Sequence, residues 1–215
     1  MEWIRPRSDF YVAQNFFARE VAQSYLAEIL QLGLHPVKGF HHPDLKPNRF
    51  HAQPKYPVSR YMGLGLYWNP LDYKYYAEMF GETPHALPQW LVQLSGELAH
   101  KHFAHLPFFA ETALVNYYLA NKKMSWHTDK EEEDKLAPVI GVNFGSTCRF
   151  YFENEKGEEE SFLLPSNSVY IFGDSARQMR HAVGSGRKNT LSIESHGLLA
   201  SGERLNITVR KVRKD

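Results

Sequence analysis

Three residues of this chain, His127, Asp129 and His181, are of the types that hold a redox-active metal ion. His127 and Asp129 stand two positions apart, and residues with this spacing on a β-strand point to the same side. Two imidazole nitrogens and one carboxylate form the facial triad of non-haem Fe(II), which leaves positions open for O2 and a co-substrate. Because His-x-Asp is frequent by chance, this interpretation depends on support from elsewhere in the sequence.

An alternation near the C-terminus supplies that support. Residues 204–210 read Arg-Leu-Asn-Ile-Thr-Val-Arg, so Arg204, Asn206, Thr208 and Arg210 share the polar face of a predicted strand. We interpret this face as the inner wall of a site, because inward arginines are costly unless anions accompany them. Two guanidinium groups can hold two carboxylates through paired hydrogen bonds. 2-Oxoglutarate is a small dicarboxylate that also chelates iron.

An Asn-x-Tyr motif at Asn116 and Tyr118 precedes His127, and Asn116 stands 11 positions before His127. Together with His-x-Asp…His and Arg-x-Asn-x-Thr-x-Arg, this motif makes the chain resemble the AlkB family of Fe(II)/2-oxoglutarate dioxygenases. Some motifs look closer to the first human AlkB homologue than to the bacterial archetype. The resemblance is good over about residues 110–212 and loose over about 55–95, and it includes the runs at residues 64–69, 137–140 and 172–175.

The resemblance implies a role for each residue of the predicted site. His127, Asp129 and His181 would be the iron ligands. Arg204 would bind the far carboxylate of 2-oxoglutarate, and Arg210, which we count among the catalytic residues, would lie by its chelating carboxylate. The residues expected to donate further hydrogen bonds to the co-substrate are Asn116, Tyr118 and Asn206.

The stretch from residue 34 to 62 has a composition unlike the rest of the chain. It contains five prolines, and Lys38, Lys46, Arg49, Lys55 and Arg60 stand against one acid, Asp44, with aromatic residues between them. A solvated loop is one interpretation. The other is a nucleotide-recognition lid, since cations follow phosphates while aromatic rings stack on bases, and the resemblance favours this lid. Candidate substrate-binding residues are Arg49, Arg60, Tyr61, Trp68 and Glu131, the last from an acidic run at residues 131–134 that is otherwise expected to be solvated.

Periodicity predicts a mainly β fold with flanking helices, an α+β arrangement in which many short strands form a double-stranded β-helix, or jelly roll. We expect residues 1–109 to supply an N-terminal arm at 1–12, helices at 13–33 and 88–102, and the lid. Residues 110–215 would form the dioxygenase core. The strands predicted in this core are 112–119, 124–128, 138–144, 147–153, 160–165, 168–172, 177–183, 190–195 and 203–212.

Composition limits the setting in which the chain works. A net charge of +1 excludes a global basic field, so a nucleic-acid footprint must be a local patch. The single cysteine, Cys148, excludes an internal disulfide and a cysteine-based zinc site. We see no signal peptide and no run long enough to span a membrane. We therefore expect a monomer in the cytoplasm.

These observations lead to a functional hypothesis. We expect an oxidative demethylase that uses Fe(II), 2-oxoglutarate and O2 to remove N-methyl groups from nucleic-acid bases such as 1-methyladenine and 3-methylcytosine, in DNA or RNA. The products would be formaldehyde, succinate and CO2. A methylated base that cannot pair normally is cheaper to flip out of a duplex, which supplies some selectivity. An alternative is a 2-oxoglutarate-dependent oxygenase that acts on a protein side chain or a small molecule.

Overall fold

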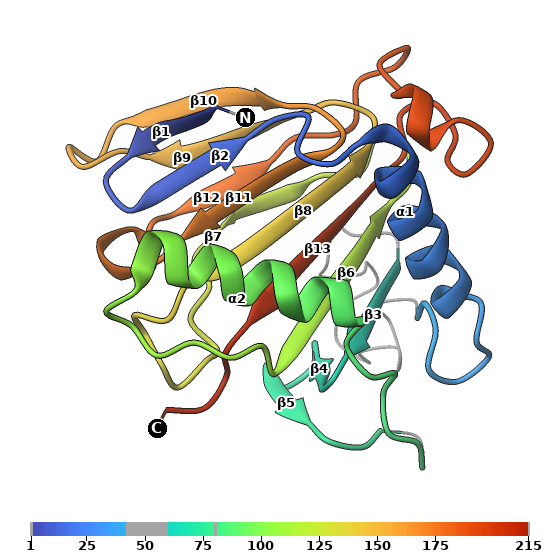
Figure 1. The fold of residues 1–215 in the computed structure, drawn as a ribbon, viewed down its shortest axis with the longest axis horizontal. Helices are drawn as coiled ribbons and strands as arrows, with labels where there is room; N and C mark the ends of the chain where they lie inside the picture. The colour runs from blue at the N-terminus through green and yellow to red at the C-terminus, as the bar shows by residue number, and fades with distance from the viewer. Residues whose placement is uncertain (1, 42–59, 80, 215) are drawn as a thin grey trace.

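The computed structural model of the chain describes residues 2–41, 60–79 and 81–214 and contains two facing β-sheets (Figure 1). The larger sheet is built from β1 (Trp3–Arg7), β2 (Phe10–Ala13), β3 (Arg60–Leu64), β6 (Thr112–Tyr118), β8 (Val139–Gly145), β11 (Ser168–Phe172) and β13 (Arg204–Arg210). Their order is β1-β2-β11-β8-β13-β6-β3, and every pairing is antiparallel. Strands from both sides of residue 110 thus share one sheet.

The smaller sheet faces the larger one and has four strands. These are β7 (Met124–His127), β9 (Cys148–Glu153), β10 (Glu159–Leu164) and β12 (His181–Val183), arranged in the order β10-β9-β12-β7. A separate hairpin joins β4 (Tyr67–Asn69) to β5 (Lys74–Tyr76). Two opposed antiparallel sheets of this kind make the jelly roll that the sequence predicts.

Two helices cover the outer face of the larger sheet, as Figure 1 shows. They are α1 (Arg19–Gly33) and α2 (Gln89–Phe103). On β13, Leu205, Ile207 and Val209 point towards these helices and join a core with apolar residues from both of them. The polar residues of β13 alternate with these three, so they point between the two sheets. None of the helices in the described ranges is long and apolar enough to cross a membrane.

An aromatic core fills part of the space between the sheets. Phe10 lies at its centre, with ring centroids 5.5 Å from Phe150 and 5.8 Å from Phe172. Gly141 has a specific function here, because a Cβ at this position would lie only 1.9 Å from the ring of Tyr170. The missing side chain therefore lets the Tyr170 ring lie flat across β8. Phe150, Tyr170 and Phe172 also line the adjoining cavity, so this core forms one of its walls.

Several predicted elements are confirmed and others are wrong. Seven of the nine strands predicted in the core, and the helix predicted at 88–102, are found within a few residues of their predicted bounds. The predicted arm at 1–12 is wrong, because Phe10 and Val12 are buried between the sheets and their strand pairs with β11. For the same reason the first helix begins at Arg19 rather than at residue 13.

Two predicted strands are also wrong, in whole or in part. Residues 190–195 contain a short 3-10 helix, Ile193–Ser195, instead of a strand. The strand predicted at 177–183 is confined to residues 181–183, because a 3-10 turn at Asp174–Ala176 precedes it. Arg177 follows that turn, and its side chain is buried in a polar network rather than exposed on a strand.

Candidate metal centre and active site

The side chains of His127, Asp129 and His181 converge at the mouth of the jelly roll. One ligand atom from each of the three lies within 4.8 Å of the others, as a common metal ion requires. His127 and His181 are directly opposite each other on the paired strands β7 and β12. Asp129 lies two residues beyond the end of β7, in a loop, although the sequence predicted strand as far as residue 128.

Backbone contacts orient both imidazole rings. Nδ1 of His127 lies 2.8 Å from the carbonyl oxygen of Ser125, and Nδ1 of His181 lies 3.2 Å from that of Met179. Each ring therefore donates Nδ1–H to a carbonyl and turns its Nε2 lone pair away from that carbonyl, which is the tautomer a metal ligand needs. Burial, together with the neighbouring His127 ring, lowers the pKa of His181 to about 4 and keeps it neutral.

Arg210 forms an ion pair with Asp129, the carboxylate of the triad. Its Nη2 lies 3.0 Å from Oδ1 of Asp129, and both side chains are buried. Burial alone would raise the pKa of the Asp129 carboxyl, but Arg210 and the two histidines lower it well below its ordinary range. Asp129 is therefore an anion, as a hard metal ligand must be. Arg210 thus lies beside the triad carboxylate, and its predicted place by the chelating carboxylate of 2-oxoglutarate stays a prediction.

Glu132 forms the centre of a buried charge network behind the triad. Its Oε1 accepts a hydrogen bond from Arg210 Nη1 at 2.8 Å, and its Oε2 accepts one from Arg177 Nη2 at 2.6 Å. Arg177 also donates to the backbone carbonyl of Asp129. Two guanidinium groups thus balance the two carboxylates of Asp129 and Glu132, which is the pairing that buried charges require. The expectation that the acidic run is solvated is wrong at Glu132, which is fully buried.

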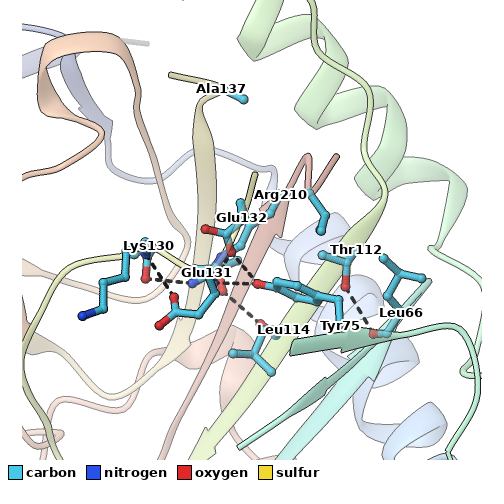
Figure 2. A network of polar contacts seen from close by, with 12 residues as sticks. Leu66, Tyr75, Thr112, Leu114, Lys130, Glu131, Glu132, Ala137 and Arg210 are labelled. Carbon is cyan, nitrogen blue, oxygen red and sulfur yellow. Dashed lines mark hydrogen bonds and ion pairs between the residues drawn. The ribbon is translucent and has the colours of Figure 1, made fainter. Parts of the chain in front are cut away.

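Tyr75 connects this network to the hairpin of β4 and β5, as Figure 2 shows. Its hydroxyl donates to Glu132 and accepts a hydrogen bond of 3.0 Å from Arg210. The same hairpin carries Trp68 and Tyr73, which line the cavity beside the triad. The position of one cavity wall is therefore tied to the arginine that holds the triad carboxylate.

Arg204 lies at the other end of the polar face of β13. Its guanidinium carbon stacks 3.5 Å above the centroid of the Tyr118 ring, and Arg204 is almost completely buried. Its Nε and Nη2 have no hydrogen-bond partner among the described residues. A buried guanidinium with unmet donors is costly, so this geometry calls for an anion that accepts from it.

The register of β13 and β6 brings the other residues predicted to bind the co-substrate close to Arg204. Asn206 is directly opposite Asn116 on the paired strands β13 and β6, and Arg204 is directly opposite Tyr118. Asn116, Tyr118 and Asn206 all line the cavity that holds the triad. The hydroxyl of Tyr170 lies 3.2 Å from Nδ2 of Asn206 and orients that amide. Sequence reasoning missed Tyr170, whose strand is apolar along most of its length.

The cavity has a volume of about 340 Å³, within the range typical of small-molecule sites. Of the predicted substrate-binding residues, it is lined by Tyr61, Trp68 and Glu131. Arg60 is exposed and precedes Tyr61 on β3, so its side chain points to the opposite face of that strand. Arg49 lies outside the described residues, as does most of the predicted lid.

Comparison with known proteins agrees with this geometry. The family model for the 2OG-Fe(II) oxygenase superfamily matches residues 9–210. The chain belongs to this superfamily. Membership implies Fe(II), 2-oxoglutarate and O2 as the reactive partners of the site. The His-Asp-His cluster provides the donor set that suits Fe(II). The unpaired guanidinium donors of Arg204 provide a place for a carboxylate of 2-oxoglutarate.

Individual relatives of this oxygenase are named for nucleic-acid chemistry. A DNA N(6)-methyladenine demethylase of Arabidopsis thaliana, ALKBH1C, is 30% identical over 115 residues, which are 49% of this chain and 25% of that protein. AlkB of Escherichia coli is 31% identical over 78 residues, covering 35% of this chain and 36% of that protein. The chain spans 25% and 54% of the length of two Arabidopsis relatives that it matches.

The solved structure of OsALKBH1 shares the fold of this oxygenase. It superposes with a TM-score of 0.79 at 22% sequence identity, over 98% of this chain and 100% of that one. A prolyl-4-hydroxylase of Pseudomonas putida also superposes, with a TM-score of 0.55 at 11% identity, over 96% and 94% of the two chains. The resemblance to AlkB proteins that the sequence motifs carry is confirmed by these relatives.

Proposed function

We propose that this oxygenase is an oxidative demethylase of N-methylated bases in nucleic acid. The observation that carries the proposal is the aromatic wall of the cavity beside the triad. Trp68 and Tyr73 come from the hairpin, while His127 comes from β7. Flat rings in the cavity wall suit a flat heterocycle, because bases stack on aromatic side chains. The names of the relatives support the same substrate class.

In the proposed reaction His127, Asp129 and His181 would hold Fe(II), and Arg204 would receive the distal carboxylate of 2-oxoglutarate. Fe(II) and 2-oxoglutarate bound there would supply, together with O2, the oxidation of the N-methyl carbon to a hydroxymethyl group, with succinate and CO2 as the other products. The hydroxymethyl group then leaves its nitrogen as formaldehyde. Arg210 keeps the Asp129 carboxylate ionised, Glu132 holds Arg210 in place through their ion pair, and the aromatic walls exclude water and orient the base.

Glu131 is the polar group proposed to recognise the base. It lines the cavity, and its Oε2 accepts a hydrogen bond of 3.0 Å from the backbone N–H of Lys130. A carboxylate can accept from the exocyclic amine of adenine or cytosine, which both candidate bases carry. Glu131 and its buried neighbour Glu132 therefore have different roles, one towards the substrate and one towards Arg210.

The test is formaldehyde release from oligonucleotides that carry 1-methyladenine, 3-methylcytosine or N6-methyladenine, each as DNA and as RNA. We expect release that requires both Fe(II) and 2-oxoglutarate, and the ratio of DNA to RNA turnover identifies the preferred polymer. If 2-oxoglutarate is consumed only with a peptide or a small metabolite, the nucleic-acid proposal is wrong and the alternative oxygenase function is correct. A cytoplasmic location and a monomeric state both stay predictions.

A further inference from the structure

A second hollow, of about 750 Å³, lies on the smaller sheet and opens to solvent. We call it the outer groove. β9 shows which face it occupies, because Phe150 and Phe152 belong to the core while Arg149 and Tyr151 alternate with them and line the groove. The groove is therefore on the outer face of the sheet whose inner face carries two of the triad residues. Its principal lining residues are Lys123, Trp126, Arg149, Tyr151, Ala182 and Arg187.

The outer groove is positively charged. Lys123, Arg149 and Arg187 line it and are exposed, and Glu159 is the one acidic residue among its lining residues in the described ranges. No ion pair joins these three cations to a carboxylate among the described residues. Their charges are thus available to an anionic partner, whereas the chain as a whole is close to neutral.

Aromatic rings accompany these charges. Trp126 is exposed, and its ring centroid lies 6.3 Å from that of Tyr151. The guanidinium carbon of Arg180 lies 5.7 Å above the Trp126 ring. A groove that combines cations with exposed aromatic rings is the arrangement that binds single-stranded nucleic acid, through phosphates and stacked bases respectively.

The outer groove is continuous with the catalytic cavity. Met124, Ser125, Trp126 and Val183 line both of them. These residues come from the edge strand β7 and its neighbour β12, so the boundary between the two hollows is one edge of the sheet. A nucleic-acid strand whose target base enters the cavity can reach the three cations by passing over this edge.

We propose that the outer groove binds the backbone of the nucleic-acid strand next to the target base, in single-stranded form. This inference rests on the proposed function and deepens it by naming a strand-binding surface. Lys123, Arg149 and Arg187 contact phosphates, and Trp126 stacks on a base beside the flipped one. The preference is for single strands, because stacking on Trp126 requires an unpaired base.

The experiment measures binding of an unmodified single-stranded oligonucleotide by fluorescence anisotropy at several salt concentrations. The variant is Lys123→Gln, Arg149→Gln, Arg187→Gln, and the matched control is Arg5→Gln, Arg19→Gln, Lys156→Gln, three exposed cations outside the groove. The logarithm of the binding constant falls linearly with the logarithm of the salt concentration, and loss of three phosphate contacts makes this slope shallower by about 2. At about 0.1 M salt the change corresponds to roughly 100-fold weaker binding. The control keeps the wild-type slope. A circular dichroism melt verifies that both variants are folded.

Turnover separates this proposal from the proposed function. The groove variant should keep wild-type demethylation of a methylated mononucleotide, which is too short to reach the groove, and lose efficiency with a methylated oligonucleotide through a raised KM. Unchanged slope and unchanged KM overturn the groove proposal while leaving demethylation intact. If no methylated base is turned over but binding still depends on the three cations, the demethylase proposal fails and the groove stands. Binding of polyglutamate in place of the oligonucleotide makes the partner an acidic protein segment and also overturns the proposal.

Discussion

Replacement of Glu132 by glutamine removes the charge at the centre of the buried network. The two ion pairs of Glu132, at 2.6 Å to Arg177 and 2.8 Å to Arg210, join groups that are almost completely withdrawn from solvent. At an effective dielectric constant of about 20, each pair attracts by about 6 kcal/mol. Much of this attraction offsets the cost of burying the ions. Loss of one buried partner then leaves an uncompensated guanidinium, which costs about 3–5 kcal/mol.

Urea denaturation with and without the substitution measures this loss. Because domains of this kind are stable by about 5–15 kcal/mol, we expect the Glu132→Gln midpoint to fall sharply while the dependence on urea stays the same. The matched control is Glu131→Gln, one residue away but facing the cavity, which should change stability by about 0.5 kcal/mol or less. Arg177→Gln in the Glu132→Gln background restores neutrality, so the double variant should be more stable than the sum of the single effects predicts. A Glu132→Gln protein as stable as the Glu131→Gln control would refute the assignment of Glu132 as a structural anion.

Four further outcomes are expected. Asp129→Ala should lose bound iron, measured by elemental analysis, and with it all 2-oxoglutarate turnover; an iron-replete variant would refute the triad. Arg204→Met should raise the Kd for 2-oxoglutarate by about 10-fold or more, since a charge-assisted bidentate contact is lost, while iron content is unchanged; equal affinity in calorimetry would move that role to another residue. Tyr75→Phe, which removes only the hydroxyl that joins the hairpin to Arg210 and Glu132, should raise the KM for the nucleic acid more than it changes the Kd for iron; wild-type kinetics would make the hydroxyl dispensable. Burial alone would raise the pKa of Glu132, but Arg210 and Arg177 lower it overall. The ionised Glu132 therefore contributes fully to stability at neutral pH, and this contribution is lost as the pH falls below the ordinary carboxyl range of about 4. Glu132→Gln should therefore lose less stability than the wild type between neutral pH and acid pH. An equal loss of stability in the two proteins would contradict this.

The sequence predicted the core of this site because its residues occupy regular strands. On β13 Arg204, Asn206 and Arg210 alternate strictly with apolar residues, so the sequence alone assigns the inner and outer faces of this strand. His127 and His181 were predicted as metal ligands from their residue type and their spacing along the chain. These signals are local, so a single sequence contains them.

What could not be predicted depends on tertiary contacts. Glu132 stands in a run of acids that look alike in the sequence, and only the positions of Arg177 and Tyr75, 45 and 57 residues away along the chain, make it a buried anion. Phe10 and Val12 give too short an alternation to distinguish a core strand from an arm. The outer groove joins residues from β7, β9 and the segment after β12, which no motif connects.

We propose that the triad and Arg204 couple oxidation of 2-oxoglutarate to removal of a methyl group from a nucleic-acid base. The most direct test is the ratio of succinate to formaldehyde formed by the wild-type protein with a methylated oligonucleotide, with Asp129→Ala as the blank. We expect equal amounts of the two products from the wild type and neither from the variant. Succinate without formaldehyde, at a rate that the methylated oligonucleotide does not change, would contradict it.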